Sequence, residues 1–83
     1  MNKILITIFV PRIEEHYDVK IPINAQVKEL IELLQKAISD MTDKVYEINP
    51  NAMLYDKITG KIINYNNIVK YSGLKNGSSV MLF

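Results

Sequence analysis

The chain has 83 residues, of which 48% are hydrophobic and 23% charged, and its formal net charge is +1. These values are typical of one globular domain, here residues 1–83, with room for one sheet and one helix around a single core. The sequence has no cysteine, which excludes disulfides, thiolate metal sites and iron–sulfur centres, and its small net charge argues against nucleic-acid binding.

Two alternating segments open the chain and predict an antiparallel hairpin. In the first segment, Leu5, Thr7 and Phe9 face one side of a strand and β-branched residues face the other side. The break at residues 11–15 predicts a short loop, after which alternation resumes. The residues predicted to face the core from these two strands are Ile4, Ile6, Ile8, Val10, Tyr17, Val19, Ile21 and Ile23.

The first apolar run also has the general form of a short signal peptide. However, residues 4–10 are far fewer than the roughly twenty that span a bilayer, and no cleavage site of small residues follows them. Pro11 and Arg12 end the run, and the acidic pair Glu14 and Glu15 comes soon after. We therefore expect the protein to stay in the cytoplasm without inserting into a membrane.

The hydrophobic period then changes from two residues to 3.6, which predicts one amphipathic helix. Asn24 is the expected N-cap. Lys28, Glu32 and Lys36 alternate in charge at i, i+4 spacing on the face that we expect to meet solvent. The helix residues expected to face the core are Val27, Leu30, Ile31, Leu34 and Ile38.

Residues 39–50 have no clear periodicity. The apolar residues in this segment are expected to pack over the open end of the core in a loop or short turn. They are Val45, Tyr46 and Ile48.

The next part of the chain predicts a second hairpin, with a strand at residues 52–56, a turn at residues 57–60 and a short return strand at residues 61–63. The return strand is expected at the margin of the sheet, where it could pair with another copy. Alternation does not decide which side of the strand at residues 52–56 faces the core. Either Met53 and Tyr55 or Ala52 and Leu54 can point to it.

The last part predicts one helical turn around Ile68 and Val69, a tight turn at Asn76 and Gly77, and a final strand at residues 79–83. The order is therefore β-β-α-β-β-β. A right-handed crossover through the helix would return the last strand parallel to the first. The predicted fold is an α+β, β-grasp arrangement, in which one helix packs across a mixed sheet.

The closing segment Gly73-Leu74-Lys75-Asn76-Gly77-Ser78-Ser79-Val80-Met81-Leu82-Phe83 resembles the final stretch of ubiquitin-like proteins. The helix start Val27-Lys28-Glu29-Leu30-Ile31, together with the short chain, is similar to the YukD/EsaB-like small proteins of Gram-positive type VII secretion systems. The resemblance implies a ubiquitin-like domain that acts by binding, as an accessory or regulatory component of such a system. In related actinobacterial machines the same domain is fused to membrane subunits, which implies a partner in the membrane-embedded apparatus.

Ubiquitin and the sulfur carriers of this fold act through a C-terminal Gly-Gly. The present sequence ends in Leu82 and Phe83, so we expect neither protein modification nor sulfur transfer. A generic β-grasp adaptor of another bacterial complex is the main alternative, and a carrier or modifier comes third.

The sequence contains no grouping of residues typical of catalysis. His16 is the single histidine, and neither a second histidine nor a close pair of carboxylates accompanies it to form a metal site or a catalytic triad. Gly60 and Lys61 lack the other residues of a phosphate-binding loop and are better explained as part of a hairpin turn. We predict no enzymatic activity, catalytic residues, metal or cofactor.

Two features predict a protein-binding surface. First, Leu5, Phe9, Met81 and Phe83 should share the sheet face opposite the helix, where a contiguous apolar patch would be available to a partner. Second, residues 57–83 carry four lysines and no acidic residue, which favours an acidic partner. The candidate binding residues are therefore Leu5, Phe9, Met81, Phe83, Lys61, Lys70 and Lys75, and self-association through the exposed face or a strand edge remains an open alternative.

Overall fold

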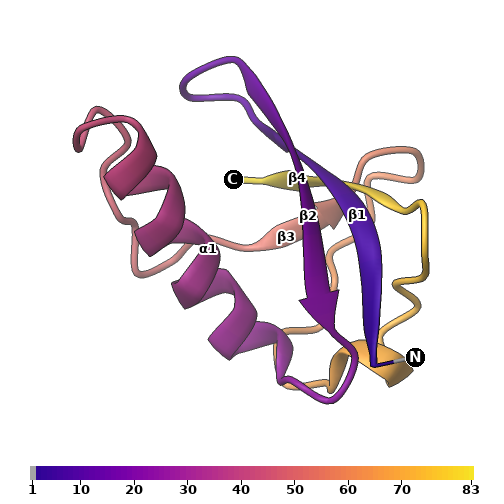
Figure 1. Cartoon of the computed structure of the whole chain (residues 1–83). Coiled ribbons are helices and arrows are strands. Elements are labelled where there is room, and N and C mark those ends of the chain that lie inside the picture. Colours follow the sequence, from indigo (N-terminus) through magenta and orange to yellow (C-terminus); the bar gives the residue numbers. More distant parts are fainter. Residues whose placement is uncertain (1) are drawn as a thin grey trace.

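A computed structural model describes residues 2–83 as one mixed sheet with a single α-helix across one of its faces (Figure 1). The strands lie in the order β2-β1-β4-β3. In chain order the elements are β1 (Lys3–Val10), β2 (Glu15–Pro22), α1 (Val27–Met41), β3 (Leu54–Asp56), the 3₁₀-helix η1 (Val69–Tyr71) and β4 (Ser79–Leu82).

The strand pairing confirms the predicted topology. β1 pairs with β2 in antiparallel register, with Leu5 opposite Lys20 and Phe9 opposite His16. β1 also pairs with β4, the last strand, in parallel register, and β3 covers the far side of β4 in antiparallel register. This mixed sheet with its crossing helix is the β-grasp arrangement expected from the sequence.

The core lies between the sheet and α1, and the predicted alternation and helical period place it there. Ile6, Ile8 and Val10 point from β1 toward the helix, and all three are at most 1% exposed. The residues that α1 buries include every one predicted from its period, namely Val27, Leu30, Ile31, Leu34 and Ile38. Burial of these apolar side chains is the main term that holds the helix on the sheet.

The start of α1 differs from the prediction, because Asn24 is not its N-cap. Gln26 precedes the first helical residue, and its side chain makes no capping hydrogen bond. Instead, the N–H groups of Val27 and Lys28 donate to the backbone carbonyls of Asn67 and Tyr65, at 2.9 and 3.1 Å. A segment 37 to 40 residues further along the chain thus supplies the acceptors that free N–H groups at a helix start require.

The segment after α1 contributes one aromatic residue to the core. Tyr46 is only 3% exposed, whereas Val45 and Ile48, which were expected to pack with it, are 72% and 53% exposed. Tyr46 packs in the apolar core and also makes a polar contact there, since its hydroxyl donates to Oε1 of the buried Gln35 at 2.8 Å. Hydrophobicity alone therefore misidentified two of the three residues.

The second predicted hairpin is shorter than expected. Ala52 and Leu54 are buried, which resolves the facing of this segment, but β3 begins only at Leu54. The return strand predicted at residues 61–63 is wrong, because this segment forms only an isolated bridge between Tyr55 and Ile62. Two backbone hydrogen bonds flank that bridge, and the turn that begins at Asn64 then ends the pairing.

Among residues 2–83, no helix combines the length and the apolar character needed to cross a membrane.

A candidate protein-binding surface on the outer face of the sheet

The face of the sheet opposite α1, here called the outer face, is formed by the alternate residues of the strands that do not enter the core. Strand register aligns one set of these residues across the whole sheet, from β2 through β1 and β4 to β3. The isolated bridge adds one more residue at the far edge. This set, here called the outer row, is His16, Phe9, Met81, Tyr55 and Ile62.

Phe9 lies inside the outer row and is held by contacts on two sides. Its ring centroid is 4.5 Å from that of His16, with an angle of 31° between the ring planes. The Lys57 ammonium group lies 5.0 Å from the Phe9 centroid and 3.3 Å from His16 Nε2. A cation over an aromatic ring is an attractive contact, so the row carries a fixed positive charge beside its apolar part.

A tight turn holds Lys57 in this position. Oδ1 of Asp56 accepts the N–H groups of Ile58 and Thr59 at 2.8 and 3.1 Å, and Gly60 closes the turn with a φ of +74°. These bonds to the ionised carboxyl, from Thr59 first and then from Ile58, lower the pKa of Asp56. The Lys57 N–H also donates to the Ser79 carbonyl at 3.0 Å, which ties the turn to β4.

Leu5 is separated from the outer row by a polar pair. Between Leu5 and Phe9 on β1, Thr7 donates from its hydroxyl to Oδ1 of Asp18 at 2.8 Å. Leu5 is 44% exposed and lies opposite Lys20. The four predicted apolar residues thus do not form one continuous patch, since only Phe9 and Met81 are direct neighbours in the register.

Phe83 lies at the other end of the outer face. Its backbone exchanges two hydrogen bonds of 3.0 Å with that of Met53, and its side chain is 68% exposed. Together with Pro11 and Tyr55 it borders a small hollow beside the outer row. Phe83 therefore extends the row toward the tip of the β1–β2 hairpin.

The three predicted lysines do not lie together. Lys61 follows the turn that carries Lys57, beside the bridge at Ile62. Lys75 lies in the turn before β4, where the next residue, Asn76, accepts the Leu5 N–H at 2.8 Å. Lys70 is on η1, with its ammonium group 5.2 Å from the Tyr71 ring centroid. Only Lys61 is placed next to the outer row.

Sequence reasoning missed Tyr55, Ile62 and Lys57 as parts of this surface. Alternation left the facing of Tyr55 undecided, and Ile62 was assigned to the return strand of the second hairpin with no facing given. Placing the third strand beside the last one, as the β-grasp order requires, would have brought Tyr55 next to Met81. Nothing in the local sequence indicates that Lys57 covers Phe9.

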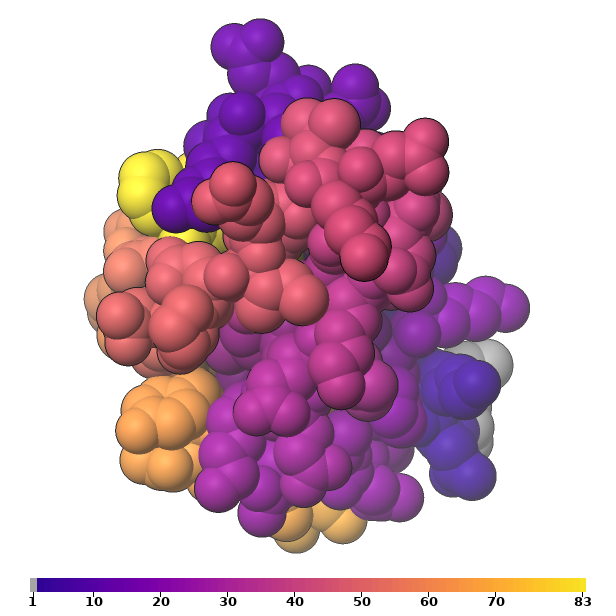
Figure 2. All heavy atoms as spheres, turned by 90° about the vertical axis from the view of Figure 1, so that its left-hand side faces the viewer, coloured from indigo at the N-terminus to yellow at the C-terminus, as the bar shows by residue number. Residues whose placement is uncertain are grey.

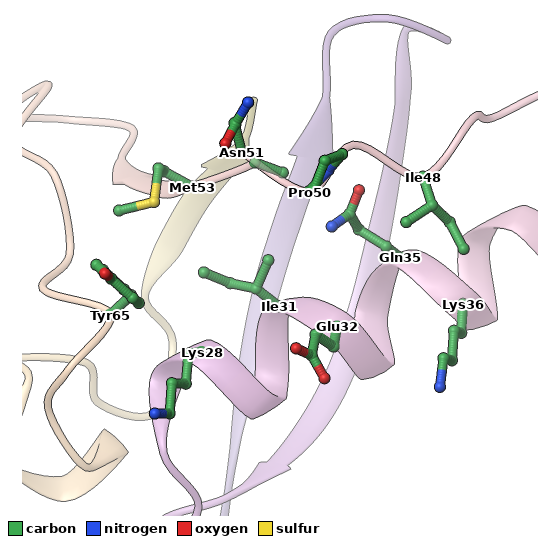
Figure 3. A pocket seen from close by; sticks show the side chains of 11 residues that line it. Lys28, Ile31, Glu32, Gln35, Lys36, Ile48, Pro50, Asn51, Met53 and Tyr65 are labelled. Carbon is green, nitrogen blue, oxygen red and sulfur yellow. The ribbon is translucent and has the colours of Figure 1, made fainter.

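A groove of about 530 Å³ lies away from the outer face, between α1 and the segment that leads into β3 (Figure 3). Lys28, Glu32 and Lys36 form its rim on the helix, and the apolar side chains of Ile31 and Met53 line its inner part. Gln35 also lines it, but its amide group is already bonded to the segment that follows α1. Side chains of both charges lie along the wall that α1 forms, and the groove residues include no cluster of reactive side chains.

Among residues 2–83, no group of three or more histidine, cysteine, aspartate or glutamate side chains is placed to hold a metal ion. His16, the one histidine, contacts Phe9 and Lys57 rather than a carboxylate or hydroxyl. The chemistry that the outer face offers is therefore apolar and aromatic contact beside fixed positive charge.

Comparison with known proteins identifies the fold. Neither a family model nor a curated protein matches the sequence. Among solved structures, the ubiquitin-like domain of EccD5 from Mycobacterium xenopi matches with a TM-score of 0.79 and 14% identity, covering 100% of this chain and 94% of that one. The chain has a ubiquitin-like β-grasp fold.

Two further structures support this assignment. The ubiquitin-like domain of the type VII secretion protein EccD1 from Mycobacterium tuberculosis matches with a TM-score of 0.73 and 14% identity, covering 99% of this chain and 98% of that one. The ubiquitin of Caldiarchaeum subterraneum matches with a TM-score of 0.65 and 15% identity, covering 96% and 90%. At these identities the likeness establishes the fold and not the activity.

Proposed function

We propose that the protein acts by binding another protein, as a cytoplasmic accessory or regulatory component of a type VII secretion system related to the YukD/EsaB-like proteins. The observation that carries the binding role is the outer row, in which apolar and aromatic side chains from four strands lie side by side. The fold shared with the ubiquitin-like domains of EccD1 and EccD5, together with the helix start that resembles YukD/EsaB-like proteins, supports the secretion role.

The outer row has the composition of the central part of a protein interface. Phe9, Met81 and Tyr55 are half-buried, so each is held in place while part of its surface stays open to a partner. Aromatic residues and methionine are enriched at interface cores because they bury large areas with few rotatable bonds. Ile62 and Phe83, which are more exposed, continue this surface at its ends.

Charge at the row narrows the kind of partner that fits. Lys57 and Lys61 lie beside the apolar residues. Two nearby carboxylates are already bonded within the chain, Asp18 to the Thr7 hydroxyl and Asp56 to the N–H groups of Ile58 and Thr59. A partner with an apolar centre and acidic residues around it would complement this arrangement, and the opposite charges would also speed association.

The test is capture of the tagged protein, crosslinked in cells of a low-GC Gram-positive bacterium, compared with the variant Phe9→Glu. A carboxylate at Phe9 would place an unmatched charge in the middle of the row, so we expect loss of the partner without loss of the fold. Val45→Glu is the matched control, because Val45 is 72% exposed and lies in the segment after α1 rather than on a strand of the sheet.

Recovery of type VII membrane components or their ATPase with the wild type and with Val45→Glu, but not with Phe9→Glu, would support both parts of the proposal. Recovery of an unrelated complex would instead support the generic adaptor role. Equal recovery with all three proteins would rule out the outer row as the binding surface. Circular dichroism of Phe9→Glu must show a folded protein for the comparison to count.

A further inference from the structure

β2 forms one edge of the sheet, and one side of its backbone faces away from β1. One hydrogen bond shows which residues of β2 bond to β1 and which point away from it. At the end of the β1–β2 ladder, the Ile23 N–H donates to the Asn2 carbonyl at 2.9 Å. In an antiparallel pair the bonded positions alternate, so Tyr17, Val19 and Ile21 bond to β1. The N–H and C=O groups of Asp18 and Lys20 therefore point outward from the sheet edge.

An apolar strip on α1 lies on the same side of the molecule as this edge. It consists of Leu33, Ala37 and Met41 at i, i+4, i+8 spacing, and Leu33 and Met41 are both 61% exposed. The opposite flank of α1 faces the segment that leads into β3, as its part in the groove of Figure 3 shows. Because β3 and β2 are at opposite edges of the sheet, the strip lies on the β2 side.

The space-filling view shows what lies on the two sides of the helix. In Figure 2 the segment after α1, in salmon, lies on one side of the helix, and the first residues of β1, in indigo, lie on the other. An unpaired strand edge and an exposed apolar strip thus lie on the same side of the molecule, and each is the kind of surface that proteins usually cover.

We propose that the β2 edge pairs with the same edge of a second copy of this chain, in antiparallel register about a two-fold axis at Val19. This register places Asp18 directly opposite the partner's Lys20, and Lys20 opposite the partner's Asp18. Both belong to the outward-pointing set, so each Asp18–Lys20 pair exchanges backbone hydrogen bonds as well as opposite charges across the strands.

Other two-fold registers fit less well. An axis at Asp18 would place two aspartates opposite each other, and an axis at Lys20 would do the same with two lysines. An axis at Tyr17 would leave Lys20 and the residues after it without a partner strand. Like charges directly opposite each other are unfavourable, so the charges of β2 select the register centred on Val19.

The same symmetry also brings the apolar strips together. A two-fold axis perpendicular to the sheet joins the two sheets into one and keeps both helices on the same face. The flanks of the two helices that carry Leu33, Ala37 and Met41 then face each other across the axis. Strand pairing and burial of the strips would therefore stabilise the same dimer.

A charge-exchange experiment tests the pairing. Lys20→Glu places acidic side chains opposite one another at both pairs, and Asp18→Lys places basic side chains there. We expect sedimentation velocity to show that the wild type passes from monomer to dimer as its concentration rises from about 10 µM to about 1 mM. Each variant should raise the dimer dissociation constant by at least about tenfold. An equimolar mixture of the two variants should associate again, because each supplies the charge that the other needs.

The double variant Asp18→Lys/Lys20→Glu is the control for folding. Loss of Asp18 also removes its bond to Thr7, but the double variant restores opposite charges and should dimerise like the wild type. A wild type that stays monomeric at about 1 mM would overturn the proposal. Dimerisation that Lys20→Glu leaves unchanged, or that Phe9→Glu abolishes instead, would also overturn it, since either result would place the contact elsewhere.

Discussion

The first half of the chain and the segment from residue 42 to residue 63 are held in different ways. In β1, β2 and α1, periodic apolar residues meet across one core, and their burial decides the structure. In the later segment, regular structure is limited to β3. Tyr46, Ala52, Leu54 and Ile63 reach the same core without a repeating pattern, and a few hydrogen bonds position the chain between them. Thus a repeating pattern determines the first region, whereas specific contacts with distant residues determine the second.

The largest effect expected from this contrast is at the core of the first region. Ile6→Ala and Leu30→Ala should each lower the free energy of unfolding by about 2–5 kcal/mol, because each removes a buried side chain and leaves a cavity. Leu33→Ala is the matched control, since Leu33 is on the same helix but 61% exposed. Urea unfolding followed by circular dichroism measures all three.

Similar losses for Leu30→Ala and Leu33→Ala would contradict the assignment of a buried and an exposed face to α1. Because Leu33 also belongs to the proposed dimer contact, the comparison should be made at low micromolar protein concentration. This concentration lies below the range in which we expect dimers, so the measured stability should report the fold alone.

A smaller effect is expected where the two regions join, at Gln35. This side chain is buried in α1, and it donates from Nε2 to the Asn49 carbonyl while its Oε1 accepts the Asn49 N–H and the Tyr46 hydroxyl. Gln35→Leu keeps the size of the side chain but leaves these groups unpaired, and it should cost about 1–3 kcal/mol.

Hydrogen exchange would show where that loss falls. We expect the amides of Tyr46 and Asn49 to exchange faster in Gln35→Leu than in the wild type. The β1–β2 amides should exchange no faster than the measured loss of global stability requires. Uniformly faster exchange would mean that the later segment is not a separately held region, and the contrast between the two regions would fail.

The same contrast explains which parts of the fold could be predicted from the sequence. Alternation placed β1 and β2, the helical period identified the buried residues of α1 apart from Gln35 and Ser39, and the turn residues at Asn76 and Gly77 preceded β4 as expected. The start of α1 was predicted wrongly because its N–H groups bond to Tyr65 and Asn67, far away in the sequence. A local pattern contains no information about such acceptors.

The candidate surface was predictable only in part, for a related reason. Alternation assigned Phe9 and Met81 to the outer face, and the parallel pairing makes them neighbours. Whether an apolar patch is continuous depends on the residues between its members, and the bond between Thr7 and Asp18 separates Leu5 from the rest. Tyr55 joined the row through its pairing with β4, which the short, irregular segment around it did not reveal.

The smallest predicted effect concerns Tyr46, the aromatic residue that the later segment buries. Tyr46→Phe removes one hydrogen bond and should cost about 0.5–1.5 kcal/mol of unfolding free energy at neutral pH.

Burial raises the pKa of Tyr46 above its ordinary value of 10.0, and nearby Arg12 opposes that shift. The folded state thus holds the hydroxyl proton more tightly than the unfolded state. Its contribution to stability is complete below pH 10 and is lost as the pH rises through the folded pKa. The stability difference between wild type and Tyr46→Phe should therefore narrow above pH 10, as urea unfolding at several pH values would show; a constant difference would mean that Tyr46 does not titrate as a buried group.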